Sequence, residues 1–268
     1  MAGRPTAMLR SALLNVMIKA AHKASRALKR DFGEVEKLQV SLKGPANFVT
    51  AADRRAEEIL HEELSQARPG YSFLGEEGGN REGTDKSHSW VVDPLDGTTN
   101  FLHGIPHFAV SIGLLREGVA IAGLIYNPAN DELYMAEKGS GAFLNDSRLR
   151  VAGRKQLNEC VIACGLPHIG RGDHEQSRNE MAALQPKVAG LRRFGAASLD
   201  LAFVAAGRLD GYWERNLQPW DIAAGIILIR EAGGTVGDIH GGDVMKTGNV
   251  VCGNEFVNGE LTKILRPL

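Results

Sequence analysis

Apolar residues recur at helical spacing in two segments at the start of the chain. Across residues 8–30, Leu13, Met17 and Ala20 belong to one apolar face opposite basic residues, which predicts an amphipathic helix. A second helix is predicted from about Ala51 to the breaker at Pro69. Because no strand precedes either helix, the N-terminal part is not a Rossmann unit.

The middle of the chain shows short apolar or alternating runs instead. Turn residues separate these runs, and no run is long enough for a helix with a clear period. Closely spaced strands of this kind predict an antiparallel meander that the two opening helices cover. The predicted strands are residues 71–74, 90–92, 108–115, 119–126 and 132–136.

Beyond about residue 155 strands and helices alternate. The order predicts a layered α-β-α-β-α sandwich, mixing α+β with α/β features. An α+β part at 1–150 and an α/β part at 151–268 would pack as one unit. The predicted strands are 160–164, 212–213 and 250–252, and the predicted helices are 175–189, 196–206, 222–232 and a last one at the C-terminus.

Composition restricts the class of protein. Hydrophobic residues make up 43% and charged residues 24% of the 268 residues, as in an ordinary soluble globular protein. With 31 basic and 32 acidic side chains, nucleic acid is not favoured as the main ligand. We find neither a signal peptide nor an apolar run of membrane-spanning length. The three cysteines form no C-x-x-C pair, so we expect buried thiols and a cytoplasmic location.

The strongest chemical signal follows the strand at 90–92. Asp93 and Asp96 stand three residues apart around Pro94, and Gly97 and Thr98 then open a turn. Oxygen ligands at a strand end suit a hard cation such as Mg²⁺, and the amides of the turn suit a phosphate. The simpler alternative is a tight turn whose carboxylates only cap backbone amides.

Two further acidic positions are weaker signals by themselves. Glu76 and Glu77 follow the strand at 71–74, where glutamates are commonly just solvated. Asp221 opens the apolar helix at 222–232, where aspartate is a favoured cap. A capping carboxylate can still bind metal through its other oxygen, so the two interpretations are compatible.

Together these motifs resemble the inositol monophosphatases, a family of lithium-sensitive, magnesium-dependent phosphatases. The resemblance runs from about residue 10 to about residue 260 and is closest to the bacterial, extragenic-suppressor branch. It is carried by Asn47 to Asp53, Gly75-Glu76-Glu77, Asp93 to Phe101, Gly139 to Asn145, Arg192 to Gly195, Ala205 to Gly211 and Trp220 to Gly225.

The resemblance implies a site for two or three Mg²⁺ ions. Glu76, Asp93 and the carbonyl of Leu95 would hold the first ion. Asp93, Asp96 and Asp221 would hold the second, and Glu76 would lie near a weaker third. Without metal, each close pair of carboxylates would repel by about 4 kcal/mol at an effective dielectric constant of 20, so we expect the site to loosen.

The resemblance also implies how substrate is held. The amides of Gly97 and Thr98 would bind the phosphate. Thr98, polarised by Asp53, would align the attacking water, with Glu76 as another proton acceptor. Lys43 would stand near the mouth of the site, and Asp96, Arg192, Ala197, Glu214 and Asp221 would contact the substrate. Ala196 replaces a hydroxyl residue of many relatives, which bears on substrate preference.

The implied activity is hydrolysis of myo-inositol monophosphate to inositol and phosphate by metal-activated water, with inhibition by lithium. A homodimer is implied as well, with Arg193 and Asp210 pairing across or within subunits. The alternatives are a fructose-1,6-bisphosphatase, a histidinol-phosphatase or a phosphoadenosine phosphatase with the same metal core. A protein-binding role in transcription machinery is the alternative outside enzymology.

Overall fold

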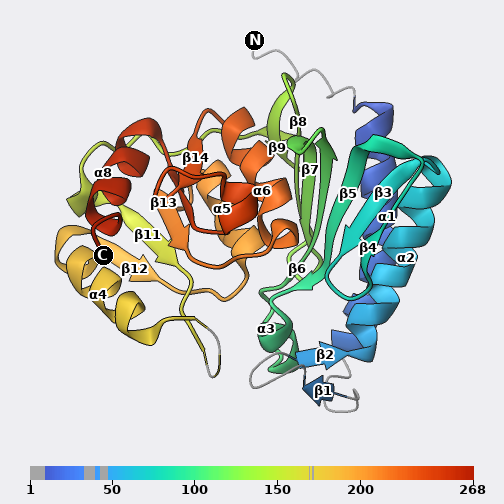
Figure 1. Ribbon diagram of the computed structural model, residues 1–268, viewed down its shortest axis with the longest axis horizontal. Coiled ribbons are helices and arrows are strands. Elements are labelled where there is room, and N and C mark those ends of the chain that lie inside the picture. Colours follow the sequence, from blue (N-terminus) through green and yellow to red (C-terminus); the bar gives the residue numbers. More distant parts are fainter. Residues whose placement is uncertain (1–9, 33–39, 43–47, 169, 171) are drawn as a thin grey trace, which may run out of the picture.

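Helices and sheets alternate in five layers (Figure 1). The computed structural model describes residues 10–32, 40–42, 48–168, 170 and 172–268. Helices α1 (Ala12–Phe32) and α2 (Ala51–Ala67) cover the outer face of a first sheet. Helices α5 (Ala197–Ala205) and α6 (Pro219–Glu231) lie between this sheet and a second one, and α4 (His174–Leu184) and α8 (Glu255–Leu265) form the last layer. The predicted α-β-α-β-α sandwich is confirmed.

The first sheet has eight strands in the order β10-β9-β8-β7-β6-β5-β3-β4. From β5 to β10 the strands form the predicted antiparallel meander, whereas β3 pairs with β5 in parallel. The parallel pairing brings the C-terminal ends of β3 and β5 to one edge of the sheet. The strands are β3 (Tyr71–Gly75), β4 (Gly79–Arg81), β5 (Asp85–Asp96), β6 (Ala109–Arg116), β7 (Val119–Asn127), β8 (Glu132–Glu137), β9 (Gly141–Leu144) and β10 (Ser147–Arg148).

The second sheet has five strands in the order β12-β11-β13-β15-β14. Helix α4 ends at Leu184, short of the predicted 189, because Pro186 lies in a 3₁₀ turn (Gln185–Lys187) that leads into a strand. The strands are β11 (Val161–Cys164), β12 (Gly190–Arg192), β13 (Gly211–Glu214), β14 (Thr235–Asp238) and β15 (Val250–Gly253). The remaining elements are β1 (Val40–Leu42), β2 (Phe48–Thr50), α3 (Thr98–Leu102), a 3₁₀ turn (Leu157–Glu159) and α7 (Val244–Thr247).

Helix α6 joins the two parts of the chain. Its residues from Ile222 to Ile229 are all buried, and it packs on β6, β7 and β8 and on α5. A Cβ atom at Gly123 would lie 2.6 Å from the Ala224 carbonyl oxygen, so only glycine allows this approach. One core contains Ile125 of β7, Ile226 of α6 and Tyr212 of β13, which makes the two sheets one packing unit.

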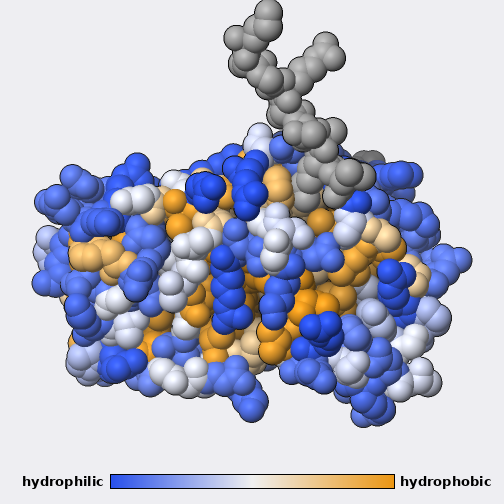
Figure 2. All heavy atoms as spheres, turned by 90° about the horizontal axis from the view of Figure 1, so that it is seen from above, coloured by the Kyte–Doolittle hydropathy of each residue, from blue (hydrophilic) through white to orange (hydrophobic). Residues whose placement is uncertain are grey.

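Figure 2 shows a face that is polar around its periphery, with apolar residues gathered toward the middle.

All three cysteines are buried free thiols, as predicted. No helix in the described ranges combines the length and the apolar character that a membrane crossing requires. Asp210 forms an ion pair with Arg154 of the same chain, at 2.9 Å.

Candidate active site

Asp93 and Asp96 lie at the end of β5, where the regular pairing with β6 is interrupted between them. Asp93 pairs with Ser111 and Asp96 with Ala109 of β6, and the register shifts between them, where Pro94 cannot donate. Gly97 then adopts a left-handed φ of 87°, and a Cβ there would lie 2.9 Å from the His107 carbonyl oxygen. Glycine is therefore required at the point where β5 turns into α3.

Two other elements bring acidic residues to the same edge. Glu76 follows β3, and its amide donates to the Val92 carbonyl of β5 at 3.3 Å. Asp221 is the third residue of α6, and its carboxylate accepts from the Gln218 amide at 2.7 Å in a capping box. The expected N-cap position of Asp221 is wrong, because α6 begins at Pro219 with Gln218 as its N-cap and Asp221 caps the helix from its third residue. A carboxylate with one capping oxygen retains acceptor capacity on the other.

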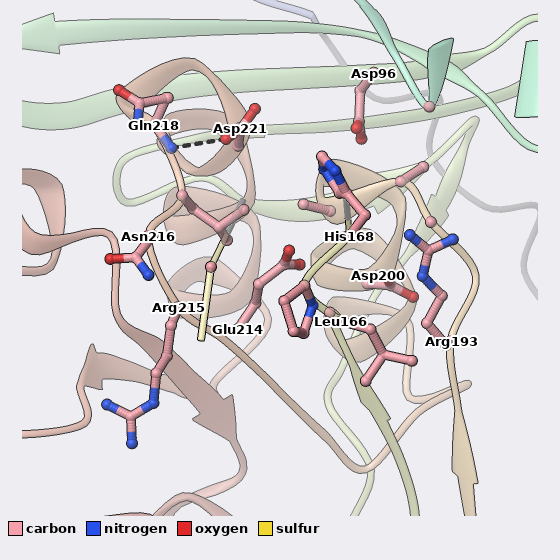
Figure 3. Close-up of a pocket in the computed structure, with 18 of the residues that line it drawn as sticks. Asp96, Leu166, His168, Arg193, Asp200, Glu214, Arg215, Asn216, Gln218 and Asp221 are labelled. Atoms are coloured by element: carbon pink, nitrogen blue, oxygen red, sulfur yellow. Dashed lines mark hydrogen bonds between the residues drawn. The ribbon is translucent and has the colours of Figure 1, made fainter. Parts of the chain in front are cut away.

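Predicted residues from these elements line a cavity of about 520 Å³. In Figure 3 Asp96 and Asp221 stand on either side of the opening, Glu214 reaches into it, and the guanidinium of Arg215 points away. The predicted site residues on its wall are Glu76, Asp93, Leu95, Asp96, Gly97, Thr98, Ala197, Glu214 and Asp221.

Two of the predicted residues do not line the cavity. Asp53 is 1% exposed on α2 and is not part of the cavity wall. Arg192 is exposed and donates to the Leu191 carbonyl, whereas the neighbouring Arg193 lines the cavity. Lys43 lies outside the described residues. Thr98 donates its hydroxyl to the Leu95 carbonyl at 2.9 Å.

Burial and like charge dominate the electrostatics. Asp93 is only 2% exposed, and its pKa is raised well above the usual value by burial and then by nearby carboxylates, among them Glu76 and Asp96. The pKa of Asp221 is raised for the same reasons, with Asp96 as the main neighbouring charge. The cavity therefore concentrates negative charge where water cannot screen it.

Asp96 is held by the start of α5, a contact that the sequence did not reveal. Burial raises the pKa of Asp96, and the hydroxyl and amide of Ser198, with the neighbouring amides of Ala197 and Leu199, lower it. The Ser198 amide lies 2.8 Å from the Asp96 carboxylate. Because Ala196 has no capping group, Asp96 satisfies this helix end from a distant part of the chain. In the sequence, the only sign of this contact was that α5 begins without a capping residue of its own.

A further buried carboxylate, Asp200, also went unnoticed in the sequence. It lines the cavity from α5, is 1% exposed, and has no hydrogen-bond partner for Oδ1 among the described residues. Burial, followed by the charges of Glu214 and Asp96, raises its pKa well above the usual value, and Arg193 lowers it. Nothing in its surroundings along the sequence distinguished Asp200 from an ordinary helical residue.

The donor set fits Mg²⁺ chemically, since it consists of carboxylate and carbonyl oxygens and excludes sulfur. Across the described ranges, however, no three Asp, Glu, His or Cys side chains meet at the spacing of a metal-ligand set. Repulsion between ionised carboxylates would oppose their closer approach. A divalent cation would remove that repulsion and favour a tighter arrangement.

Known proteins show the same combination of fold and motifs. An inositol-1-monophosphatase of Mesorhizobium japonicum is 62% identical over 260 residues, covering 97% of this chain and 98% of that protein. The Nus factor SuhB of Escherichia coli is 42% identical, covering 91% and 92%. The crystal structure of the extragenic suppressor protein suhB from Bartonella henselae superimposes with a TM-score of 0.93 at 56% identity, covering 96% and 99%.

The family match spans nearly the whole chain and includes every element that lines the cavity. Residues 9–267 match the inositol monophosphatase family. The fold that supports the acidic cavity is thus shared with these relatives, as the motifs indicated. The chain belongs to the inositol monophosphatase family.

Proposed function

We propose that this protein hydrolyses a myo-inositol monophosphate to inositol and phosphate in a reaction that requires Mg²⁺. The observation that carries the proposal is the environment of Asp93. This carboxylate is buried, and the charges that shift its pKa most come from Glu76, Asp96, Asp221 and Asp53, all acidic. A protein that gathers buried like charges in a cavity requires a cation there. The relative named inositol-1-monophosphatase supports the choice of substrate.

The residues that would hold the metal are those on the cavity wall. Glu76, Asp93 and the Leu95 carbonyl form one set, and Asp93, Asp96 and Asp221 form the other. Bound Mg²⁺ would lower the pKa of a coordinated water and neutralise charge on the leaving oxygen. Two or three ions per site remain a prediction.

The phosphate would meet the turn after β5. Gly97 and Thr98 both line the cavity, and their amides would donate to the phosphoryl oxygens. Thr98, polarised by Asp53, would align the attacking water and take up its proton, with Glu76 as the alternative proton acceptor. These groups orient the reactants and hold the proton at a defined atom.

Glu214 supports recognition of a polyol. Its carboxylate extends into the cavity and accepts a hydrogen bond from the Tyr212 hydroxyl. A Cβ at Gly165 would lie 1.8 Å from the Glu214 Cδ atom, so glycine leaves the space that this carboxyl group occupies. A carboxylate fixed in this way would accept hydrogen bonds from ring hydroxyls, and Arg193 would balance charge on the opposite wall.

Replacing one carboxylate tests the reaction. Asp93→Asn should lower kcat for inositol 1-phosphate by at least about 100-fold, because the isosteric amide cannot supply the charge that binds cations. Asp146→Asn is the matched control, since Asp146 has 83% of its side chain exposed and contacts only Arg10 among the described residues. Initial rates with circular dichroism on both variants separate chemistry from folding. Near-normal turnover of the folded Asp93→Asn variant would exclude the mechanism.

Related phosphatase activities remain alternatives, because the metal site acts on phosphate and few residues contact the alcohol. Initial rates with inositol 1-phosphate, fructose 1,6-bisphosphate, histidinol phosphate and phosphoadenosine phosphate would rank them. A role in transcription is favoured by one observation, the 42% identity to a relative named Nus factor SuhB. A cellular phenotype that persists unchanged with Asp93→Asn would support that role.

Three properties implied by the resemblance stay predictions. These are inhibition by lithium, assembly into a homodimer and a cytoplasmic location. Asp210 pairs with Arg154 within the chain, and a pairing of Arg193 with Asp210 across a dimer stays a prediction.

A further inference from the structure

We infer that Glu57 is a positioning residue that holds the turn carrying Glu76 in place for metal binding. The inference rests on the proposed function, because it concerns the same metal site. Glu57 belongs to α2, is 3% exposed, and is not part of the cavity wall. It acts through the backbone of the turn and not by touching the metal or the substrate.

The contacts are two hydrogen bonds from consecutive amides. The Glu77 amide donates to Glu57 Oε2 at 2.7 Å, and the Gly78 amide donates to Oε1 at 2.6 Å. The preceding amide, that of Glu76, donates to the Val92 carbonyl next to Asp93. Three successive amides of the turn therefore attach it to β5 on one side and to α2 on the other. This arrangement fixes the backbone of Glu76 relative to Asp93.

The glycines around the turn are matched to this carboxylate. A Cβ at Gly75 would lie 2.4 Å from Glu57 Oε2, and a Cβ at Gly78 would lie 2.7 Å from Oε1. Side chains at these positions would displace the carboxylate from the amides. The Gly-Glu-Glu-Gly segment is thus shaped by the need to accept an acidic group from another element, in addition to presenting Glu76.

Charge and position on α2 support the same role. Glu57 lies one helical turn after Asp53, so a single helix supplies both residues at four-residue spacing. Arg81 of β4 is the cation whose charge acts on Glu57, and Arg54 lies 3.5 Å from the Glu77 carboxylate. Groups that support metal ligands commonly change metal affinity by about 10- to 100-fold when they are replaced.

Mg²⁺ binding to the full-length protein tests the inference. Glu57→Gln keeps the size of the side chain but replaces one acceptor oxygen by a donor, so one amide of the turn loses its partner. Isothermal titration calorimetry should show an Mg²⁺ dissociation constant raised about tenfold. The Mg²⁺ concentration for half-maximal activity should rise in parallel, while kcat at saturating Mg²⁺ stays within about threefold.

Glu63→Gln is the matched control. Glu63 is another buried glutamate of α2, but its carboxylate contacts Lys19 and Lys23 of α1. This variant should bind Mg²⁺ like the unmodified protein even where its melting temperature falls. Equal Mg²⁺ affinity in Glu57→Gln and Glu63→Gln would overturn the inference.

A second variant disturbs the contact between Glu57 and the turn by changing the turn. Gly78→Ala leaves Glu57 intact but places a methyl group where the carboxylate now lies. It should weaken Mg²⁺ binding as well, and it decides the question if Glu57→Gln does not fold; unchanged affinity would overturn the inference. Failure of the unmodified protein to bind Mg²⁺ would instead refute the proposed function.

Discussion

The pKa of an individual carboxylate in this protein depends on how deeply it is buried and on which hydrogen-bond donors surround it. Asp238, for example, is buried, which raises its pKa, yet hydrogen bonds from Thr247, Gly242 and His240 lower the pKa overall. Asp200 is buried more completely, its Oδ1 has no hydrogen-bond partner among the described residues, and its pKa is raised. Ionisation of Asp238 therefore stabilises the fold, and ionisation of Asp200 destabilises it.

The contrast between these two aspartates gives a prediction on pH dependence. The folded protein binds the Asp200 proton more tightly than the unfolded chain, so this group lowers stability as pH rises above 3.8 and through the raised pKa. Asp200→Asn stays neutral. Without Mg²⁺ it should melt about 2 °C or more above the unmodified protein at pH 8, with the difference shrinking toward pH 4.

Thermal unfolding at several pH values, followed by circular dichroism, measures this difference. Asp238→Asn is the control of opposite sign: it should lower the melting temperature at pH 8, because an ionised acceptor of three donors is lost. A gain for Asp200→Asn that does not depend on pH would show that charge is not the cause.

At the scale of elements, the site depends on how closely α6 approaches the first sheet. Gly113 of β6 and Gly123 of β7 present no side chain to α6, and a Cβ at either would lie within 2.8 Å of it. Asp221 stands in the first turn of this helix. The position of one metal-binding candidate is thus set by two glycines in strands more than 90 residues earlier.

Gly123→Ala should therefore destabilise the protein by about 1–3 kcal/mol, since the methyl group meets the backbone of α6, which cannot rotate away. Gly237→Ala is the matched control: Gly237 also lies in a strand, but no atom lies within 4 Å of its added Cβ. Urea unfolding of both variants gives the comparison. Equal midpoints would show that α6 has room at this contact.

At the scale of the whole molecule, the candidate site draws on both parts of the chain. Glu76 directly follows β3, and Asp93 and Asp96 lie at the end of β5, while Asp221 and Glu214 come from α6 and β13. The core that contains Ile125 and Tyr212 also crosses between the sheets. Stability and metal binding should consequently be linked across the entire fold.

Adding Mg²⁺ should raise the melting temperature in one cooperative transition, because a ligand that binds only the folded state stabilises by about RT ln(1 + [Mg²⁺]/Kd). Differential scanning calorimetry in EDTA and in increasing Mg²⁺ measures this. The same titration with Ca²⁺ or Na⁺ distinguishes a specific site from general screening. Two separate transitions, only one of them sensitive to Mg²⁺, would contradict the linkage.

The sequence alone determined the layers and the chemistry. Hydrophobic periodicity located α1, α2, α6 and most strands, because burial on one face requires a regular spacing of apolar residues. The strand ending in Asp93 and Asp96, with Gly97 after them, predicted a site for metal and phosphate because backbone geometry and ligand type are local properties. The short strands β1, β2, β4, β9, β10, β12 and β14 were not predicted, since a few residues carry too little periodicity.

Only the tertiary structure decided which groups meet. The parallel pairing of β3 with β5, the capping of α5 by Asp96 and the support of the Glu76 turn by Glu57 are contacts between distant segments. Arg193, the residue after β12, lines the cavity, whereas the neighbouring Arg192 does not. Such choices follow from packing three-dimensional surfaces together, and no local pattern of residues encodes them.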